Sequence, residues 1–411
     1  MNVLDIPILS FLLAADSAEA LQLPLSMLAV FGTAKLFAEL FERLKQPGVV
    51  GEILAGILIG PSVLGWVQPN ELLTALSELG VMFLLFRVGL EVKASELFRV
   101  GGTATLVAML GVAVPFLSGW AILSLWGEPQ IEAIFVGAAM VATSVGITAQ
   151  VLATKNLLDH TAAKIILAAA VIDDVLGLLV LATVSSMAKG AVHIGGLVMT
   201  AVMAIAFTVI VAVAGTRALK RVVPKATQTL NAGEVQFNLA MILLFGLAVL
   251  AVYAGVAAII GAFLAGMALA ESVSHRVHDL AHGITELLVP FFLAGIGLHM
   301  DLAAFSEPGT PFLALLILAA AVASKLIGCG LGAVKLGWDN MLRIGCGMVP
   351  RGEVGMVVAQ LGLSLGVVQA RIYGVVVFMA VMTTVVAPAM LNLAFKNVGR
   401  TDQENETFRL G

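Results

Sequence analysis

The sequence contains few charged residues and almost no cysteine. Only 12% of its 411 residues are Asp, Glu, Lys or Arg, about half the share found in soluble globular proteins. Its two cysteines, Cys329 and Cys346, belong to no CxxC or Cys/His grouping. This excludes a disulfide scaffold and a cysteine-based metal site. We interpret both cysteines as small buried hydrophobic residues.

The sequence also lacks a strong charge of either sign, because its formal net charge is −4. We therefore expect no nucleic-acid partner, and no motif predicts a cofactor. The chain is instead 60% hydrophobic, with a mean hydropathy of +1.06 and 42 glycines. Apolar stretches of about 20 residues recur along it, as in proteins that cross the lipid bilayer many times. The sequence predicts an all-α polytopic membrane protein.

The hydropathy pattern predicts 13 transmembrane helices in a single membrane unit, residues 22–396. Residues 1–21 are expected to form a lead or interfacial segment, and residues 397–411 a cytoplasmic tail. The expected spans are 22–43, 49–66, 76–92, 101–126, 131–153, 161–187, 195–217, 236–254, 255–274, 285–299, 310–335, 341–365 and 370–396.

The distribution of Lys and Arg predicts the orientation of these spans. With the N-terminus outside, sixteen Lys and Arg residues fall in cytoplasmic segments, whereas the outer segments hold only Lys189 and Arg371. Cytoplasmic loops are the positively charged ones in most membrane proteins. We therefore expect an outer N-terminus and a cytoplasmic C-terminus.

Two spans at matching positions are interrupted near their middle. Residues 22–187 and 236–396 are read as two six-helix repeats of opposite orientation, joined by a linker helix at 195–217. The fifth span carries "ATSVGIT" (142–148) and the twelfth carries "GMVPRGEVG" (347–355). Paired discontinuous helices are typical of the binding site of a secondary transporter.

Two adjacent aspartates, Asp173 and Asp174, lie inside an apolar run. An aspartate at the bilayer centre costs about 3 kcal/mol, and intramembrane ionisable groups usually mark ion or proton pathways. Neighbouring residues of a helix point about 100° apart, so the two carboxylates can serve different partners. Lys325 lies deep in another span and needs a carboxylate partner. A permanent salt bridge that only joins helices is the alternative role for this group.

Further polar groups occur at the two interruptions. Arg351 and Glu353 are expected to compensate the ends of the half-helices, as structural charges or as part of the transport path. Thr143, Ser144 and Thr148 offer oxygen ligands that suit a hard cation. Hydroxyl groups of this kind also repair interrupted helices, and this alternative stays open.

Other charged groups are interpreted as packing or surface features. Lys35 with Glu39, and Arg87 with Glu91, have the i,i+4 spacing of helical ion pairs. Three histidines lie close together in the sequence: His275, His278 and His282. We interpret them as part of a solvent-exposed helix; a metal site or a pH sensor is the less favoured alternative.

The motifs together resemble one known family. They are "QPGVVGEILAGILIGPSVLG", "LGVMFLLFRVGLE", "MVATSVGIT", "AAAVIDDVLGLLVLA" and "VPRGEVGMVVA". In this order, over residues 22 to 396, they are similar to the bacterial monovalent cation/proton antiporters of the second antiporter superfamily. Arg87 departs from the apolar residue expected in the second motif.

The resemblance implies a homodimer of 13-helix subunits, each with a dimerisation part and a core part that contains two crossed discontinuous helices. It also implies that Asp174 carries the transported ion and that Asp173 pairs with Lys325. It further places Thr143, Ser144 and Glu353 near the helix crossing.

We therefore predict a transporter rather than an enzyme, with Na⁺, Li⁺ and H⁺ as its substrates. By the same resemblance, the Asp-Asp doublet implies electrogenic exchange of Na⁺ for H⁺ by alternating access, in a bacterial cytoplasmic (inner) membrane. Potassium/proton exchange is the main alternative, and a cation channel is a weaker one. An intramembrane aspartyl protease would need its two aspartates on different helices.

Overall fold

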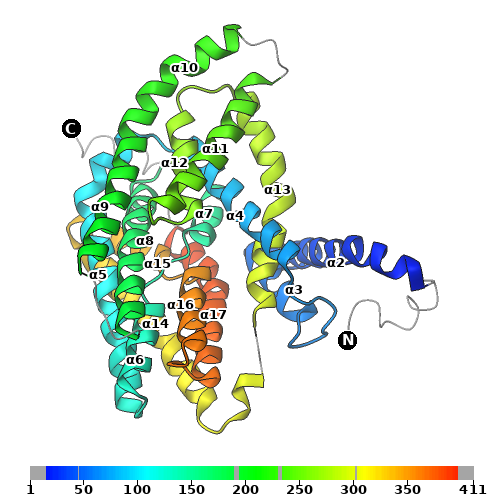
Figure 1. Cartoon of the computed structure of the whole chain (residues 1–411), viewed down its shortest axis with the longest axis vertical. Coiled ribbons are helices and arrows are strands. Elements are labelled where there is room, and N and C mark those ends of the chain that lie inside the picture. The colour runs from blue at the N-terminus through cyan, green and yellow to red at the C-terminus, as the bar shows by residue number, and fades with distance from the viewer. Residues whose placement is uncertain (1–14, 45, 189–193, 230–233, 301–302, 397–411) are drawn as a thin grey trace.

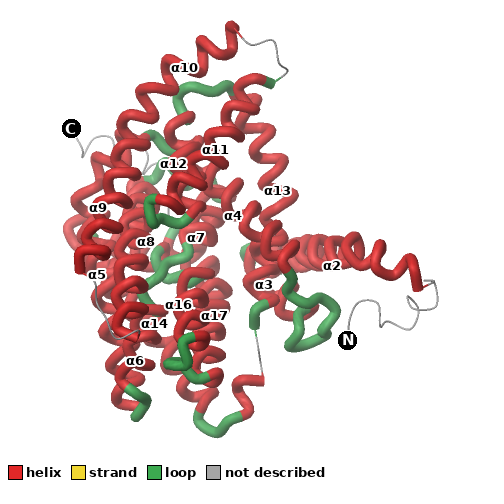
Figure 2. The backbone as a smooth tube through the Cα atoms, in the orientation of Figure 1, coloured by secondary structure: helices red, strands yellow, loops and turns green. Residues whose placement is uncertain are grey.

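The computed structural model describes residues 15–44, 46–188, 194–229, 234–300 and 303–396, which form helices joined by short loops (Figures 1 and 2). Nine helical stretches within these ranges are long and apolar enough to cross a membrane. They are α2 (Ala15–Arg43), α4 (Glu71–Glu91), α5 (Ala94–Trp126), α8 (Thr161–Ala188), α9 (Ile194–Ile210) continued by α10 (Thr216–Thr229), α11 (Val235–Tyr253), α13 (His275–Leu298), α14 (Thr310–Gly332) and α17 (Ala370–Ala394).

Six further helices of 10 to 12 residues complete the membrane unit, together with two 3₁₀ turns at Ala303–Ser306 and Val334–Leu336. They are α3 (Gly48–Ile59), α6 (Gln130–Ala139), α7 (Val145–Thr154), α12 (Ala258–Leu269), α15 (Trp338–Gly347) and α16 (Glu353–Ser364). The predicted fifth span is thus split into α6 and α7, and the predicted twelfth into α15 and α16. The prediction of two interrupted helices is confirmed.

Several helix boundaries differ from the expected spans for local reasons. Helix α3 ends at Ile59, not at 66, because Pro61 lacks an N–H and favours an extended residue before it. Gly60 is extended, with ψ 178°. Helix α4 begins earlier than expected, at Glu71, where the Asn70 side chain accepts a hydrogen bond from the N–H of Leu73 at 2.9 Å. This is the usual N-cap arrangement.

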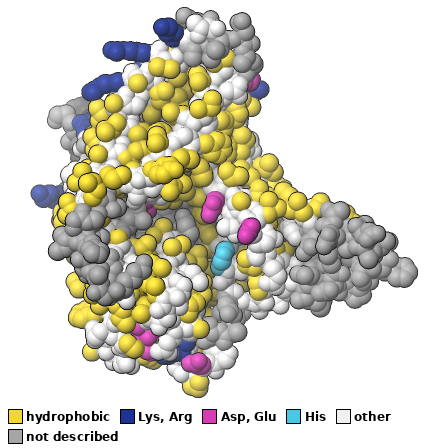
Figure 3. Space-filling view, viewed as in Figure 1, with side chains coloured by type: hydrophobic (Ala, Val, Ile, Leu, Met, Phe, Trp, Pro, Cys, Tyr) yellow, Lys and Arg dark blue, Asp and Glu magenta, His cyan; other side chains and the backbone are white. Residues whose placement is uncertain are grey.

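The linker helix is also longer than the expected 195–217. Helix α9 (Ile194–Ile210) continues through a five-residue π-helical segment, Val211–Gly215, into α10 (Thr216–Thr229). Lys and Arg side chains gather around α10 at one end of the molecule, while hydrophobic side chains cover most of the visible face (Figure 3). Such a surface suits a protein surrounded by lipid.

The helices form two groups. One contains α2, α3, α4, α11, α12 and α13, and the other contains α5, α6, α8 and α14 to α17. Close approaches hold the first group together. A Cβ built on Gly56 would lie 2.0 Å from the carbonyl oxygen of Ala294, and one on Gly266 would lie 2.1 Å from that of Phe86. Small residues permit this backbone contact, which drives helix association in membranes.

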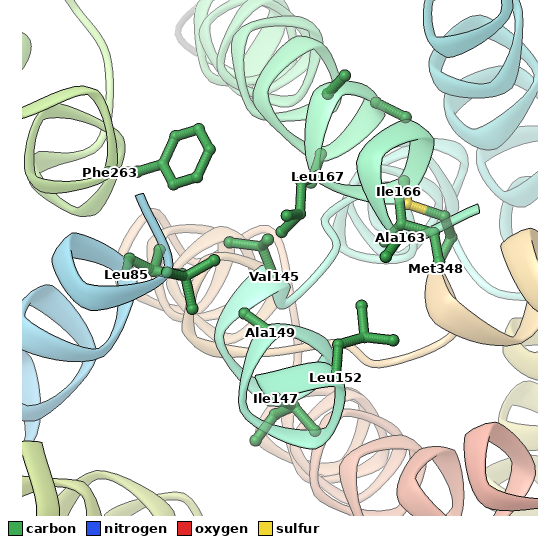
Figure 4. Packing of buried hydrophobic residues seen from close by; sticks show 14 of the residues in the cluster. Leu85, Val145, Ile147, Ala149, Leu152, Ala163, Ile166, Leu167, Phe263 and Met348 are labelled. Carbon is green, nitrogen blue, oxygen red and sulfur yellow. The ribbon is translucent and has the colours of Figure 1, made fainter. Parts of the chain in front are cut away.

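Helix α7 packs between the two groups. Figure 4 shows Leu85 of α4 and Leu167 of α8 approaching Val145 of α7, inside one large cluster of buried hydrophobic residues. Helix α2, in contrast, projects away from the other helices in Figure 1 and contacts mainly α3. It begins at Ala15, so residues 15–21 of the expected lead segment belong to the same helix as the first span. Residues 1–14 and the tail 397–411 lie outside the described residues.

Candidate ion-binding site

The two adjacent aspartates lie in different environments on α8. Asp173 is 1% exposed, whereas Asp174 is partly exposed, as the 100° turn between neighbouring residues requires. Lys325 of α14 is fully buried, and its Nζ donates hydrogen bonds to both carboxylate oxygens of Asp173, at 3.1 and 3.3 Å. The buried ammonium is therefore neutralised by Asp173, and Asp174 remains on the more accessible side of the helix.

Helix α5 covers this ion pair closely because residue 111 is a glycine. A Cβ built on Gly111 would lie 2.6 Å from Sγ of Cys329, 3.4 Å from Nζ of Lys325 and 3.9 Å from Oδ1 of Asp173. A larger side chain would displace the lysine or its neighbour. This glycine could not be predicted from the sequence, since nothing local distinguishes it from the many other glycines of the chain.

The two helix interruptions contact each other. The N–H of Ser144 donates to the carbonyl oxygen of Pro350 at 2.8 Å, and Oγ1 of Thr148 donates to that of Gly347 at 2.6 Å. A Cβ on Gly352 would lie 2.7 Å from both Cβ and Oγ of Ser144. These contacts satisfy backbone groups that the interruptions leave without helical partners.

Arg351 is the main connection between the interruptions. Its buried guanidinium donates from Nη1 to the carbonyl oxygens of Val141 and Ala142, at 3.2 and 3.1 Å, and from Nη2 to that of Ala321 at 3.1 Å. Its backbone N–H donates to Oγ1 of Thr383 at 3.1 Å. A fixed positive charge thus lies at the C-terminal end of α6, where the helix dipole is negative.

The interruption after α6 lies against α8, the helix that carries the aspartates. Gly177 follows Asp174 by three residues, on the same face of α8, and a Cβ on Gly177 would lie 4.0 Å from Cγ1 of Val141. The side-chain oxygens of Thr143 and Ser144 are buried and have no hydrogen-bond partner among the described residues. Oxygen atoms left in this way suit a hard monovalent cation.

The other sequence-predicted residues lie as follows. Glu353 begins α16, but its side chain is outside the described set. The three histidines lie in the first turns of α13, which begins at His275. The expected Lys35–Glu39 pair is wrong: Nζ of Lys35 lies 3.1 Å from Oε1 of Glu52, and Glu39 pairs with Arg43 at 2.8 Å. A partner from another helix replaced the partner within the same helix.

A mostly apolar cavity of about 520 Å³ separates the two helix groups on one side of α7. Its walls come from α4, the start of α12 and α13 on one side and from α16 and α17 on the other. Ser77, Glu78, His299 and Gln360 supply its polar groups. Neither Asp173 nor Asp174 is among the residues that line it.

An all-helical membrane protein with two touching discontinuous helices beside a buried Asp–Lys pair has the architecture of a secondary transporter. The chain belongs to the family described as "Sodium/hydrogen exchanger, transmembrane", which matches residues 26–397. This confirms the resemblance to monovalent cation/proton antiporters.

Individual relatives cover nearly the whole chain. The Na⁺/H⁺-K⁺ antiporter GerN of Bacillus cereus is 34% identical over 88% of this chain and 94% of its own length. The high-affinity Na⁺/H⁺ antiporter NhaS3 of Synechocystis sp. is 34% identical over 92% and 91%. The sodium proton antiporter MjNhaP1 of Methanocaldococcus jannaschii shares the fold, with a TM-score of 0.68 at 18% identity over 90% and 97%.

Proposed function

We propose that this protein is an antiporter that exchanges Na⁺, and also Li⁺, for H⁺ across a bacterial cytoplasmic membrane. The main observation behind the proposal is that the two aspartates have different environments: Lys325 neutralises Asp173, whereas Asp174 is partly accessible. Three relatives that are Na⁺/H⁺ antiporters support the same substrates: GerN, which is a Na⁺/H⁺-K⁺ antiporter, NhaS3 and one from Enterococcus hirae.

The mechanism follows from competition for one set of oxygens. Asp174 binds either a proton or Na⁺, and the side-chain oxygens of Thr143 and Ser144 complete the Na⁺ site. A bare carboxylate crosses the apolar barrier poorly, so the site moves only when loaded. Alternating access arises when the group of helices that contains α8 and α14 moves against the group that contains α2. Asp173 and Lys325 hold the geometry and supply a further exchangeable proton. Glu353 and Arg351 act as structural charges near the crossing.

The finer architecture belongs to the same proposal. Counting α6 with α7 and α15 with α16 as single crossings, and adding α3 and α12 to the nine long stretches, supports 13 transmembrane helices. Residues 22–187 and 236–396 then form two inverted repeats around the linker. The Lys and Arg asymmetry supports an outer N-terminus and a cytoplasmic C-terminal tail.

We also propose a homodimer, in which the group containing α2 forms the dimerisation part. Helix α2 exposes Leu28 and Leu36, at 67% and 71%, and projects from the other helices in Figure 1.

Electrogenic exchange completes the proposal, because two carboxylates and one lysine allow more than one proton to be exchanged for each Na⁺.

The competing candidate is potassium/proton exchange, which is supported by the similarity to GerN, a Na⁺/H⁺-K⁺ antiporter. The test is to reconstitute the protein in proteoliposomes that contain a pH-sensitive dye and to add Na⁺, Li⁺ or K⁺ chloride. Na⁺ and Li⁺ are expected to collapse the proton gradient with saturation, whereas K⁺ is not. A response to K⁺ alone would replace the sodium assignment, and single-channel currents would replace the carrier by a channel.

A further inference from the structure

A second, polar cavity of about 420 Å³ lies apart from the aspartate site. Helices α2, α3 and α13 form one wall, helices α7 and α17 form the other, and neither Asp173 nor Asp174 lines it. In the orientation proposed above it opens toward the cytoplasm, because the C-terminal ends of α2, α7 and α17 meet there.

The first wall of this cavity is acidic. Glu39, Glu42, Glu52 and Glu286 line it. Two ammonium groups also line the cavity: Lys35 on the same wall, and Lys155 on the opposite wall, where its Nζ donates to Oδ1 of Asn392. Glu52 is the buried member, at 5% exposed, and Nζ of Lys35 contacts its Oε1 at 3.1 Å. Carboxylates that outnumber ammonium groups at a low-dielectric wall create a negative potential that attracts cations.

The second wall contributes a buried amide. Gln150 of α7 is 8% exposed and lines the cavity, and its Oε1 accepts no hydrogen bond from any described residue. Leaving a buried acceptor unsatisfied is unfavourable, so this oxygen calls for a ligand. Thr148, two residues earlier, points about 200° away on the helix and contacts the other interruption at Gly347. The Gln150 oxygen therefore serves the cavity and not the helix crossing.

We propose that Glu52 and Gln150 bind a partly hydrated monovalent cation at a staging site on its route to Asp174. The role in transport rests on the proposed function, whereas the binding itself does not. A carboxylate and an amide oxygen are ligands for a hard cation. Among the described residues no group of three or more His, Cys, Asp or Glu is placed to hold a metal ion. Gln150 follows Ser144 by six residues, about 9 Å along α7.

Binding of isotope-labelled Na⁺ to the purified full-length protein tests the site. In the Asp174→Asn variant, which lacks the transport site, saturable Na⁺ binding is expected to remain. Adding Gln150→Leu should weaken it about tenfold, the effect of losing one strong contact. Gln46→Leu is the matched control, since Gln46 lines the same cavity but is exposed. Absence of Na⁺ binding in Asp174→Asn, or an equal loss with Gln46→Leu, overturns the proposal.

A variant that is expected to bind Na⁺ more tightly gives a result that misfolding cannot explain. Gln150→Glu keeps the side-chain length and replaces the amide by a carboxylate, so Na⁺ binding at pH 9 should become tighter; unchanged or weaker binding overturns the proposal. Failures of the two proposals are distinguishable. Normal exchange by the unmodified chain with no Na⁺ binding in Asp174→Asn refutes the staging site alone, whereas retained binding without exchange refutes antiport alone.

Discussion

Nζ of Lys325 lies within hydrogen-bond distance of both carboxylate oxygens of Asp173, although the two residues are 152 positions apart in the chain. Both side chains are buried. Removing one member of such a pair leaves an uncompensated charge in a medium that cannot solvate it, whereas removing both charges costs much less. The pair thus fixes α8 against α14 and determines which aspartate remains available.

This asymmetry predicts the stability of variants at the pair. Lys325→Ala should destabilise the protein by about 3–5 kcal/mol, because Asp173 is left buried and charged. The double variant Asp173→Asn/Lys325→Gln should recover much of the loss. Thermal unfolding midpoints of the three proteins measure this, and equal midpoints for Lys325→Ala and the original chain would show that the pair has no structural role. Transport current that Lys325→Ala leaves unchanged would contradict its electrogenic role.

Asp174→Asn should abolish exchange, because an amide carries no proton and no charge for Na⁺. The measurement is the Na⁺-driven change of a pH-sensitive dye in proteoliposomes. Asp159→Asn is the control, since its side chain is 83% exposed in the loop before α8. Exchange that persists in Asp174→Asn would remove this residue from the ion site.

Competition at Asp174 predicts how exchange depends on pH. Protons and Na⁺ bind the same oxygens, so the apparent KM for Na⁺ should rise as the pH falls, while saturating Na⁺ restores the same maximal rate. Initial rates over a grid of pH and Na⁺ concentration test this. A maximal rate that falls with pH at an unchanged KM would indicate separate sites for the two ions.

Arg351 predicts a second stability effect. A lysine at this position has one ammonium group and cannot reach the carbonyl groups of both α6 and α14 in the way the guanidinium does. Arg351→Lys should therefore lower stability by about 2 kcal/mol or more, since hydrogen bonds to charged groups contribute about 1.5–3 kcal/mol each. Arg343→Lys serves as the comparison on α15, because among the described residues Arg343 donates to a single main-chain carbonyl, that of Ala394, and to the side chain of Asn340. An equal effect of the two variants would refute the bridging role.

Gly352 predicts a steric effect at the crossing. Gly352→Ala places a Cβ 2.7 Å from Ser144, so the interruptions must separate and the exchange rate should fall at least tenfold. Gly283→Ala is the matched change on α13, where nothing lies within 4 Å of the added carbon. It should be neutral or slightly stabilising, because alanine favours a helix over glycine. Normal exchange by Gly352→Ala would show that the interruptions tolerate separation.

Much of the site could be predicted because membrane burial makes its residues conspicuous. Charged groups such as Asp173, Lys325 and Arg351 stand out in an apolar sequence. Placing them in the membrane costs free energy, which indicates a functional or structural role. Gly111 and Gln150 carry no such cost, so nothing in the sequence marked them. Their importance depends on which atoms neighbouring helices bring close, and the same is true of the partner of Lys35, which is Glu52 and not Glu39.

The sequence by itself determined that this chain lies in a membrane, where its helices are interrupted and which charged groups lie within the spans. Hydropathy, proline and glycine act locally, so a linear sequence expresses them directly. Only the tertiary structure decided which aspartate neutralises Lys325, that Arg351 joins the interruption after α6 to α14, and where a polar cavity opens beside α7. Helix association in lipid has no hydrophobic pattern to reveal it, because lipid and helix surfaces are equally apolar and close packing selects the neighbours.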